Sequence, residues 1–301
     1  MSRTDPAPAL AAPSETAPLG RVLVKRPADA LGSAEAGAEA GAAWRELGWT
    51  SPPDPESARR EHEAFVALLE EAGARPVFLP AAPGTGLDSL YARDASVICR
   101  RGAILCRMGK EARLGEPEAQ AEAYRELGVP VIGRIEPPGT LEGGDFVWLD
   151  GRTAAVGRGY RTNEEGIRQL RRLLEGDVDE LVVVPLPHWR GPADVFHLMS
   201  VLSPVDRDLA VVHSPLLPVP FRELLLELGI ELVEVPDREF DTLGCNVLAT
   251  GPRRCLMAEG SPITRRRLEA AGAEVTCFSG REICLKGQGG PTCLTRPVTR
   301  G

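Results

Sequence analysis

One cysteine near the end of the chain stands in an unusual local setting. Cys293 in "LKGQGGPTCLTRP" follows closely on Gly287, Gly289 and Gly290. A glycine-rich segment loses much conformational entropy on folding, but it lets the backbone approach a ligand closely. A reactive cysteine must be accessible, and its surroundings must favour the thiolate. The pattern makes Cys293 a candidate nucleophile, and the other six cysteines lack this setting.

Three further polar residues could complete a catalytic set with this thiol. Asp94 stands in "YARDASVI", Glu142 in "LEGGDFVWL" and His197 in "FHLMSVL", each just before or at the start of an apolar run. A nucleophile, an acid–base residue and carboxylates that meet in one pocket form a catalytic constellation. Such a set needs neither a metal nor a cofactor, and the spacing of histidines and cysteines suggests no metal site.

Each of these residues taken alone has an ordinary structural interpretation. Asp94 is of a type common in turns and caps, and "LEGGD" is typical of a polar loop. A lone His197 is more often a hydrogen-bonded buried histidine, and a lone Cys293 is more often structural. The catalytic hypothesis therefore depends on all of them occupying equivalent positions in a repeated unit.

The elements that would position these residues recur along the chain. Five predicted helices each end on a glycine and lead directly into an apolar strand. A glycine past a helix end adopts the left-handed conformation at no steric cost. Their spacing of roughly 50 residues is typical of repeat architectures. These glycines are Gly73, Gly128, Gly176, Gly229 and Gly272.

Hairpin signals lie between these helices, as in "FVWLDGRTAAVG", where Asp-Gly separates two apolar runs. The predicted unit is therefore a hairpin, a helix and a strand, and four units are complete within the chain. The fifth has a helix near Glu56–Gly73 and a strand near Pro76–Leu79, but no local hairpin. The strands "RVLVKRP", from Arg21, and "CLTRPV", from Cys293, could supply it and close the chain into a ring. An ordinary open α/β sheet is the alternative.

In a ring of this kind, residues at the start of each unit's first strand lie at the same height around the axis. Their side chains would converge on one central pocket. The positions are occupied by Asp94, by Glu142 with Asp145, by His197, by Asn246 and by Cys293.

The composition excludes several classes of protein. A net charge of −8 implies no basic surface for nucleic acid. No apolar run approaches the roughly 20 residues of a membrane span, and we expect a cytoplasmic protein. The seven cysteines are scattered without a CxxC pair, which argues against a disulfide framework or a zinc site. Residues 1–19, rich in Ala, Pro, Ser and Thr, predict a disordered leader before a single catalytic domain over residues 20–301.

Five motifs in order give the chain a family resemblance. From Arg21 onward it resembles the guanidino-group-modifying superfamily of dimethylarginine dimethylaminohydrolases, arginine deiminases and amidinotransferases. Any one motif is weak evidence, and the ordered set is strong. The resemblance implies a five-bladed α/β propeller of ββαβ units with pseudo-five-fold symmetry, in which the terminal strands pair. The motifs are "YARD", "LEGGD", "RTN", "FHLMS" and "GGPTC".

The resemblance also implies a role for each catalytic candidate. Cys293 matches the family nucleophile, and His197 matches its general acid and base. Glu142 matches the carboxylate that contacts both the guanidinium and the histidine. Asp94 matches the carboxylate that binds the guanidinium nitrogens.

Further matches imply contacts to the rest of the substrate. Asp88 matches a substrate-contacting aspartate of the dimethylarginine hydrolases. Arg107, in "CRMGKEAR", and Arg161, in "GYRTN", match arginines that hold the carboxylate of the amino acid. Asp145 is expected to support this substrate-binding set.

Two departures leave the substrate open. Deiminases and amidinotransferases carry an aspartate where this chain has Met199, and dimethylarginine hydrolases carry a glutamate where it has Arg93. The first hypothesis is hydrolysis of dimethylarginine to citrulline and dimethylamine through a covalent thiouronium on cysteine. Arginine deimination or another guanidine hydrolysis, amidinotransfer, and non-catalytic arginine binding are the alternatives. The expected partner is a small guanidino compound, and a homodimer is compatible with these features.

Overall fold

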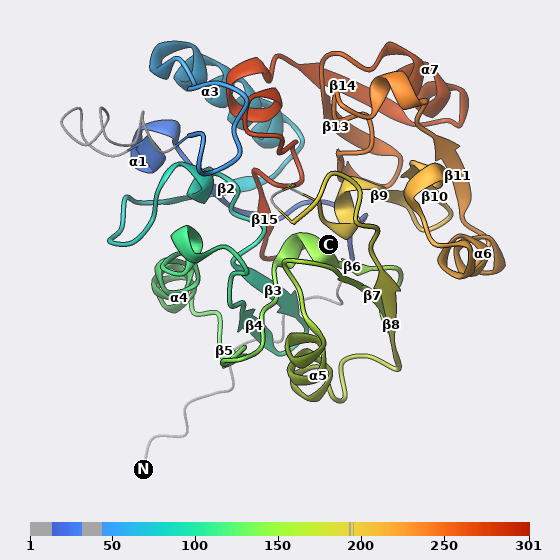
Figure 1. Ribbon diagram of the computed structural model, residues 1–301. Helices are drawn as coiled ribbons and strands as arrows, with labels where there is room; N and C mark the ends of the chain where they lie inside the picture. Colours follow the sequence, from blue (N-terminus) through green and yellow to red (C-terminus); the bar gives the residue numbers. More distant parts are fainter. Residues whose placement is uncertain (1–13, 32–43, 193, 195) are drawn as a thin grey trace.

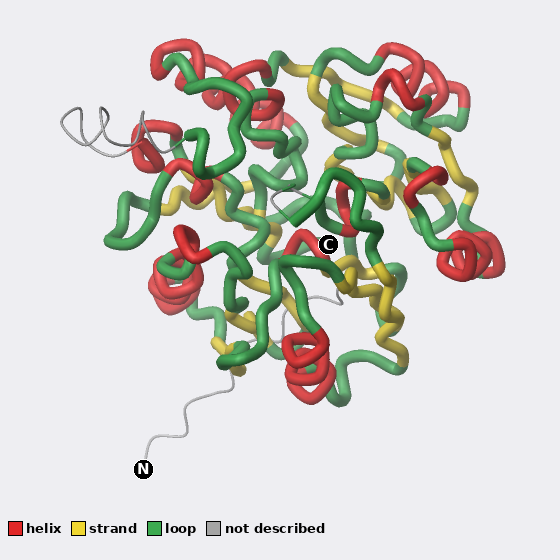
Figure 2. Tube along the Cα trace, viewed as in Figure 1, coloured by secondary structure: helices red, strands yellow, loops and turns green. Residues whose placement is uncertain are grey.

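The computed structural model describes residues 14–31, 44–192, 194 and 196–301. Their strands form five separate three-stranded sheets. The sheets lie around a common centre, and the longer helices lie on the outside (Figure 1). Loops fill much of the centre between the sheets (Figure 2).

Four of the sheets are built from the same unit. In each, an antiparallel hairpin is followed by a helix and by a strand parallel to the second hairpin strand. The first two units are β3 (Ser96–Cys99), β4 (Gly102–Leu105), α4 (Glu116–Glu126) and β5 (Val131–Arg134), then β6 (Phe146–Trp148), β7 (Thr153–Arg158), α5 (Glu164–Leu173) and β8 (Glu180–Pro185). The next two are β9 (Leu202–Asp206), β10 (Leu209–Val212), α6 (Val219–Glu227) and β11 (Glu231–Glu234), then β12 (Val247–Gly251), β13 (Arg254–Ala258), α7 (Pro262–Ala270) and β14 (Glu274–Phe278).

The fifth sheet joins the two ends of the chain. Its central strand β1 (Arg21–Lys25) lies parallel to β2 (Arg75–Leu79), which follows helices α1 (Pro27–Leu31) and α3 (Pro55–Glu71). On its other side β1 pairs antiparallel with β15 (Arg296–Pro297). The predicted α/β class and the predicted pairing of the terminal strands are confirmed. Among the described residues no sheet closes on itself, so a closed propeller with fivefold symmetry stays a prediction.

The helix ends follow the sequence pattern. All five predicted glycines have φ between 66° and 90°, the left-handed region in which a side chain would be strained. At the start of α5, Asn163 accepts a hydrogen bond from the N–H of Gly166 (2.8 Å). Its side chain also accepts from the N–H of Thr140 (3.0 Å). This cap therefore ties the loop that carries Arg161 to the segment before Glu142.

The packed part of the chain begins before residue 20, where the sequence analysis placed the start of the domain. Residues 1–13 of the predicted leader lie outside the described residues. Residues 14–19 lie within them, and Glu15 and Leu19 are both buried. Leu19 forms a β-bridge with Arg300. Residues 14–19 therefore belong to the packed part of the chain, and the leader itself stays a prediction. In the described part of the chain no helix is both long and apolar enough to cross a membrane.

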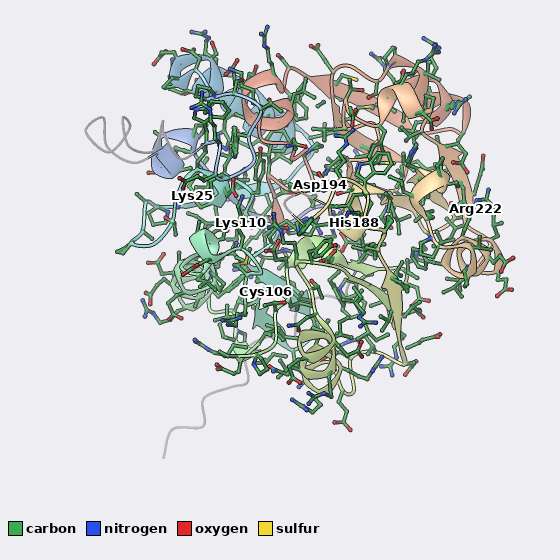
Figure 3. All side chains as sticks on the ribbon, in the orientation of Figure 1. Lys25, Cys106, Lys110, His188, Asp194 and Arg222 are labelled. Atoms are coloured by element: carbon green, nitrogen blue, oxygen red, sulfur yellow. The ribbon has the colours of Figure 1, made fainter. Side chains whose placement is uncertain are left out.

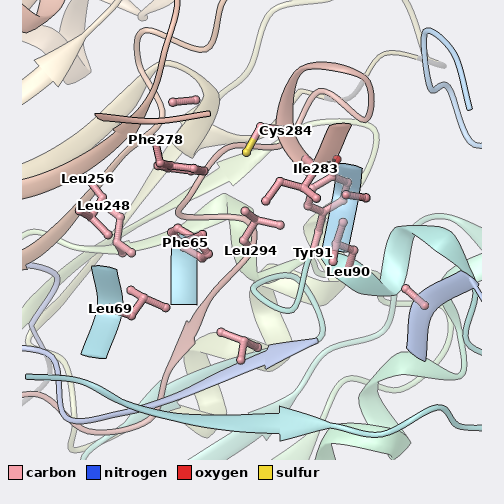
Figure 4. Packing of buried hydrophobic residues seen from close by; sticks show 14 of the residues in the cluster. Phe65, Leu69, Leu90, Tyr91, Leu248, Leu256, Phe278, Ile283, Cys284 and Leu294 are labelled. Atoms are coloured by element: carbon pink, nitrogen blue, oxygen red, sulfur yellow. Dashed lines mark hydrogen bonds between the residues drawn. The ribbon is translucent and has the colours of Figure 1, made fainter. Parts of the chain in front are cut away.

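The largest apolar cluster fixes α3 and the segment before Cys293 to the fifth sheet (Figure 4). Phe65 of α3 is fully buried, and its ring centroid lies 4.8 Å from that of Phe278. Leu294, next to the candidate nucleophile, belongs to the same cluster, and Cys293 packs against it. The position of the thiol is therefore coupled to the core.

Replacing Phe65 by alanine should lower the free energy of unfolding by about 3–5 kcal/mol, because it removes a fully buried aromatic side chain and leaves a cavity. Leu226→Ala is the matched control on a helix, since Leu226 is 48% exposed. Its effect should stay within about 0.5 kcal/mol. Urea unfolding measures both, and equal effects would contradict the described core.

Candidate active site

The five polar residues at the strand starts do converge. Asp94 precedes β3, Glu142 precedes β6, His197 precedes β9, Asn246 precedes β12 and Cys293 precedes β15. Short single-turn helices separate two of them from their strands, at Gly143–Asp145 and at Leu198–Ser200. The repeat therefore brings residues up to 200 positions apart to one place.

A hydrogen bond between Glu142 and His197 forms the centre of the site. Nε2 of His197 donates to Oε2 of Glu142 over 2.7 Å, and both side chains are buried. The other ring nitrogen, Nδ1, lies 4.0 Å from Oδ1 of Asp94. The histidine thus lies between two carboxylates.

The glycines of "LEGGD" allow this close approach. A Cβ on Gly144 would lie 2.7 Å from both Oδ1 of Asp94 and Nδ1 of His197. Real Cβ atoms do not approach polar atoms so closely, so a side chain there would push the two catalytic candidates apart. The motif is therefore required by the geometry of the site rather than by a turn.

The surrounding charges decide the protonation of this pair. Burial alone would lower the pKa of His197, but Asp94, Asp145 and Glu142 around it raise that pKa to about 9. Burial alone would raise the pKa of Glu142. The hydrogen bond from His197 and the Arg161 cation outweigh burial and hold this pKa well below the usual range. At neutral pH the pair is an imidazolium beside a carboxylate.

Glu142 has two further partners. Nη1 of Arg161 lies 3.1 Å from Oε2 of the carboxylate, and the N–H of Gly109 donates to Oε1 over 2.9 Å. Arg161, expected from the resemblance at a substrate carboxylate, therefore already contacts the catalytic candidates.

Asp94 is held by an arginine that the sequence analysis did not single out. Nη1 of Arg113 donates to Oδ2 of Asp94 over 2.7 Å, and the same guanidinium makes two bonds of 2.8 Å to Glu116. Oδ1 of Asp94 is buried and has no hydrogen-bond partner among the described residues. One carboxylate oxygen is thus fixed, and the other is available for a ligand.

Cys293 is half-buried and has its own partner. The amide of Asn246 donates to Sγ over 3.2 Å, and Oδ1 of Asn246 accepts from the N–H and the hydroxyl of Thr292. Burial, followed by the charge of Asp94, raises the pKa of the Cys293 thiol. In the free protein the sulfur is therefore a thiol at neutral pH.

The glycines before Cys293 also let the backbone pack closely against neighbouring side chains. A Cβ on Gly290 would lie 2.5 Å from Asn246, and one on Gly289 would lie 2.5 Å from the ring of Tyr91. Neither glycine has a positive φ. The loop therefore runs directly against the side chains that support the thiol.

A small cavity opens over the sulfur. Its volume is about 70 Å³, and both Cys293 and His197 line it. Asp194 and His188 lie toward the middle of the molecule, whereas Arg222 lies at its edge (Figure 3). Oδ2 of Asp194 is buried without a hydrogen-bond partner in the described part of the chain. The other walls are Trp189, Arg190, Asp194, Phe196, Ser200, Phe240, Asp241, Leu243, Asn246 and Gln288.

Asp145 supports the site rather than facing it. It accepts hydrogen bonds from the hydroxyl of Thr162 (2.6 Å) and the N–H of Leu198 (3.0 Å). Burial raises the pKa of Asp145 to about 6. Because Leu198 directly follows His197, this carboxylate fixes the backbone that carries the imidazole.

Among the described residues, the side chains of Asp88 and Arg107 form no hydrogen bond or ion pair with Asp94, Glu142, His197 or Cys293. Asp88 accepts from Nε1 of Trp49 (2.8 Å) and from Nζ of Lys110 (2.6 Å). Arg107 donates to the carbonyl of Gly139 over 3.3 Å. The sequence analysis missed Trp49 and Lys110, although "CRMGKEAR" places a lysine and a second arginine close behind Arg107.

Asp94, Glu142 and His197 also offer one ligand atom each within 4.8 Å of one another. A metal ion there would require the free electron pair of a neutral imidazole. The raised pKa of His197 keeps that nitrogen protonated at neutral pH. The arrangement therefore suits a planar cation with N–H donors better than a metal.

Comparison with known proteins agrees with this geometry. The family model described as arginine deiminase matches residues 88–219 and 217–300. The chain belongs to the arginine deiminase family. A dimethylarginine dimethylaminohydrolase of Streptomyces coelicolor is 34% identical over 69% of this chain and 73% of its own length. An arginine deiminase of Mycobacterium marinum is 31% identical over 70% of this chain and 60% of its own.

A solved structure extends the likeness within the family. The dimethylarginine dimethylaminohydrolase of Pseudomonas aeruginosa, a cysteine-to-serine mutant with citrulline bound, superimposes with a TM-score of 0.73 at 25% identity. The match covers 94% of this chain and 100% of that one. The family membership expected from the motifs is confirmed.

The charge balance of this family member predicts its titration. His197 should titrate near pH 9 in the free protein, and Asp145→Asn should lower that pKa because it removes one of the carboxylates that raise it. NMR of ring-labelled histidine, with His197→Gln for assignment among the four histidines, measures both. Asp179→Asn, an exposed carboxylate paired with Arg152, should leave the pKa unchanged. A pKa of His197 near 6.5 would show that the carboxylates do not control it.

Proposed function

We propose that this protein hydrolyses the guanidino group of an arginine derivative, with dimethylarginine as the first candidate and citrulline and dimethylamine as products. One observation carries the proposal. A buried carboxylate oxygen of Asp94 that has no partner among the described residues lies beside the Glu142–His197 pair, and the Cys293 thiol lines the same cavity as His197. The relatives named as dimethylarginine dimethylaminohydrolases and arginine deiminases support the same reaction class.

The carboxylates account for recognition of a cation. A guanidinium is planar and offers N–H donors that suit paired, charge-assisted hydrogen bonds to carboxylates. Oδ1 of Asp94 lacks any other partner in the described chain, so a bound guanidinium would satisfy it. A second contact to Glu142 would align the central carbon with the sulfur.

The bound cation would also activate the nucleophile. Cys293 is a thiol in the free protein because burial and Asp94 raise its pKa. A positive charge next to the sulfur favours the thiolate, so the thiol would lose its proton to solvent as the substrate binds. The cationic substrate therefore contributes to the reactivity of the enzyme.

The first half of the reaction would form a carbon–sulfur bond and break a carbon–nitrogen bond. The thiolate attacks the guanidinium carbon, and the electron pair of a C–N double bond moves to nitrogen. Nδ1 of His197, the nitrogen that Glu142 does not engage, donates its proton to the dimethylamino nitrogen as the carbon–nitrogen bond breaks, and dimethylamine leaves. A thiouronium remains on Cys293, and His197 becomes neutral.

The second half would restore the enzyme. The neutral His197 accepts a proton from water while the water oxygen attacks the thiouronium carbon. Collapse of the tetrahedral adduct breaks the carbon–sulfur bond, the hydroxyl proton of the adduct passes to solvent, and citrulline and the thiolate are released. The sum is one water consumed and one amine released.

The walls of the cavity favour a methylated substrate. Trp189, Phe196, Phe240 and Leu243 line the space over Cys293. Met199 is buried two residues after His197, where the resemblance places an aspartate in deiminases. A thioether accepts hydrogen bonds only weakly, so it would leave the N–H groups of unsubstituted arginine poorly satisfied.

Arginine itself is the second candidate, and one observation favours it. Oδ2 of Asp194, in the wall of the same cavity, is buried without a partner among the described residues. An additional carboxylate would bind the N–H groups that methylation removes. Deimination would follow the same steps, with ammonia as the leaving group. A homodimer and a cytoplasmic location stay predictions.

Cys293 should become covalently modified by a haloacetamidine, which places a cationic amidine beside the sulfur. Mass spectrometry should find the adduct on Cys293, and dimethylarginine should protect it. Cys277→Ser, which removes the other half-buried thiol of the described chain, should be labelled like the wild type. An adduct on Cys277 together with turnover by Cys293→Ser would contradict the assignment of the nucleophile.

Wild-type kcat/KM for asymmetric dimethylarginine should exceed that for arginine. One N–H donor left unsatisfied at about 1–3 kcal/mol would allow a preference of up to about a hundredfold. Met199→Asp should reduce it, whereas the apolar control Met199→Leu should retain it. Citrulline formation measures all three, with dimethylamine and ammonia separating the reactions. A preference for arginine of about tenfold or more would favour the deiminase alternative.

A further inference from the structure

A second group of buried charges lies apart from the catalytic cluster. Three arginines, Arg93, Arg296 and Arg300, are each at most 6% exposed. They come from the residue before Asp94, from β15 and from the segment after β15. Glu15 of the N-terminal segment is buried beside them, with Oε2 at 3.3 Å from Nη1 of Arg93. The proposed hydrolysis uses none of these groups.

The arginines are only partly satisfied by the protein. Nε of Arg93 donates to the carbonyl of Thr292, and Nη1 of Arg296 donates to that of Ser96. Nη1 of Arg300 donates to two further carbonyls. Four buried nitrogen atoms have no partner in the described part of the chain: Nη2 of Arg93, Nε of Arg296, and Nε and Nη2 of Arg300.

The charges do not balance either. Burial lowers the pKa of Arg296 to about 10 and that of Arg300 to about 9, so both remain cations at neutral pH. Arg93 adds a third positive charge. Glu15 is the carboxylate whose negative charge stabilises the cationic forms of Arg296 and Arg300. Buried charges without a counter-charge destabilise a fold strongly. Water could accept hydrogen bonds here, but it would bring no negative charge.

A small cavity adjoins the donors of Arg296 and Arg300. Its volume is about 30 Å³, and its lining includes Arg296, Arg300 and Glu15 with the apolar rings of Phe146 and Trp148. A buried water needs at least about 10–15 Å³ of such space, so the cavity has room for a small anion. A larger cavity of about 600 Å³, also lined by Arg300 and Glu15, lies next to it and offers access.

We propose that Arg296 and Arg300, with Arg93 and Glu15 beside them, form a binding site for a small monovalent anion of the halide class, with chloride as the ligand. The N–H groups of Arg296 and Arg300 that lack a partner in the described chain donate to the ion. Its negative charge adds to that of Glu15 and leaves one net positive charge in the cluster.

The site would stabilise the segments that carry the catalytic candidates. The amide N–H of Arg93 donates to the carbonyl of Cys293 over 3.1 Å, and its side chain holds the carbonyl of Thr292. An ion that reduces the repulsion among the three buried arginines would therefore help to hold Arg93, and with it the backbone at Thr292 and Cys293.

Anomalous diffraction tests the site directly. Crystals of the full chain grown without halide and soaked in sodium bromide should show a bromine peak within hydrogen-bond distance of Nε of Arg296 and of Arg300. Ordered water at this place with no bromine peak, or peaks confined to exposed arginines, would overturn the proposal.

Thermal unfolding gives an independent test in solution. Replacing sodium gluconate by sodium chloride at equal ionic strength should raise the Tm by about 2 °C or more, as expected for a ligand that binds the folded state. Arg300→Gln, which removes two of the four unpartnered donors, should abolish this rise. Arg207→Gln, an exposed arginine at the larger cavity, should retain it. An equal rise in both variants would mean that chloride acts only through the general surface, and no rise in the wild type would mean that chloride does not bind the folded protein; either result overturns the proposal.

Discussion

The buried hydrogen bond between His197 and Glu142 is the interaction on which the rest of the site depends. It places a protonated imidazole 2.7 Å from a carboxylate, with both side chains shielded from water. Two charges in such surroundings are tolerated only when every group around them is paired. Arg161 and the Gly109 amide complete the partners of Glu142, and Asp94 provides a second carboxylate toward the histidine. A cation that binds between these carboxylates and Cys293 would complete the set.

Much of this arrangement could be predicted from the sequence, because each prediction rested on a local rule. A glycine at each helix end and an Asp-Gly at a hairpin report backbone conformation directly, and all five helix-end glycines have the expected positive φ. Once the unit was recognised, the residues at the strand starts followed. The pairing of β1 with β15 followed as well, because one unit lacked a hairpin.

The partners of the charged side chains could not be predicted in the same way. Arg113 binds Asp94 from 19 residues away, and Lys110 binds Asp88 from 22 residues away. These pairs depend on how neighbouring loops fold against each other, and no periodicity reports that. The glycines before Cys293 are a similar case. Their presence was noticed in the sequence, but the reason, contact with Asn246 and Tyr91, is visible only in the structure.

The central claim is that the buried carboxylates recognise a guanidinium cation, and calorimetry tests it most directly. Cys293→Ser should bind dimethylarginine without turnover, and it should bind citrulline, which has the same amino acid part but a neutral head group, at least about tenfold more weakly. Asp94→Asn in the same background should remove most of this difference. Equal affinities of Cys293→Ser for dimethylarginine and citrulline would contradict the account.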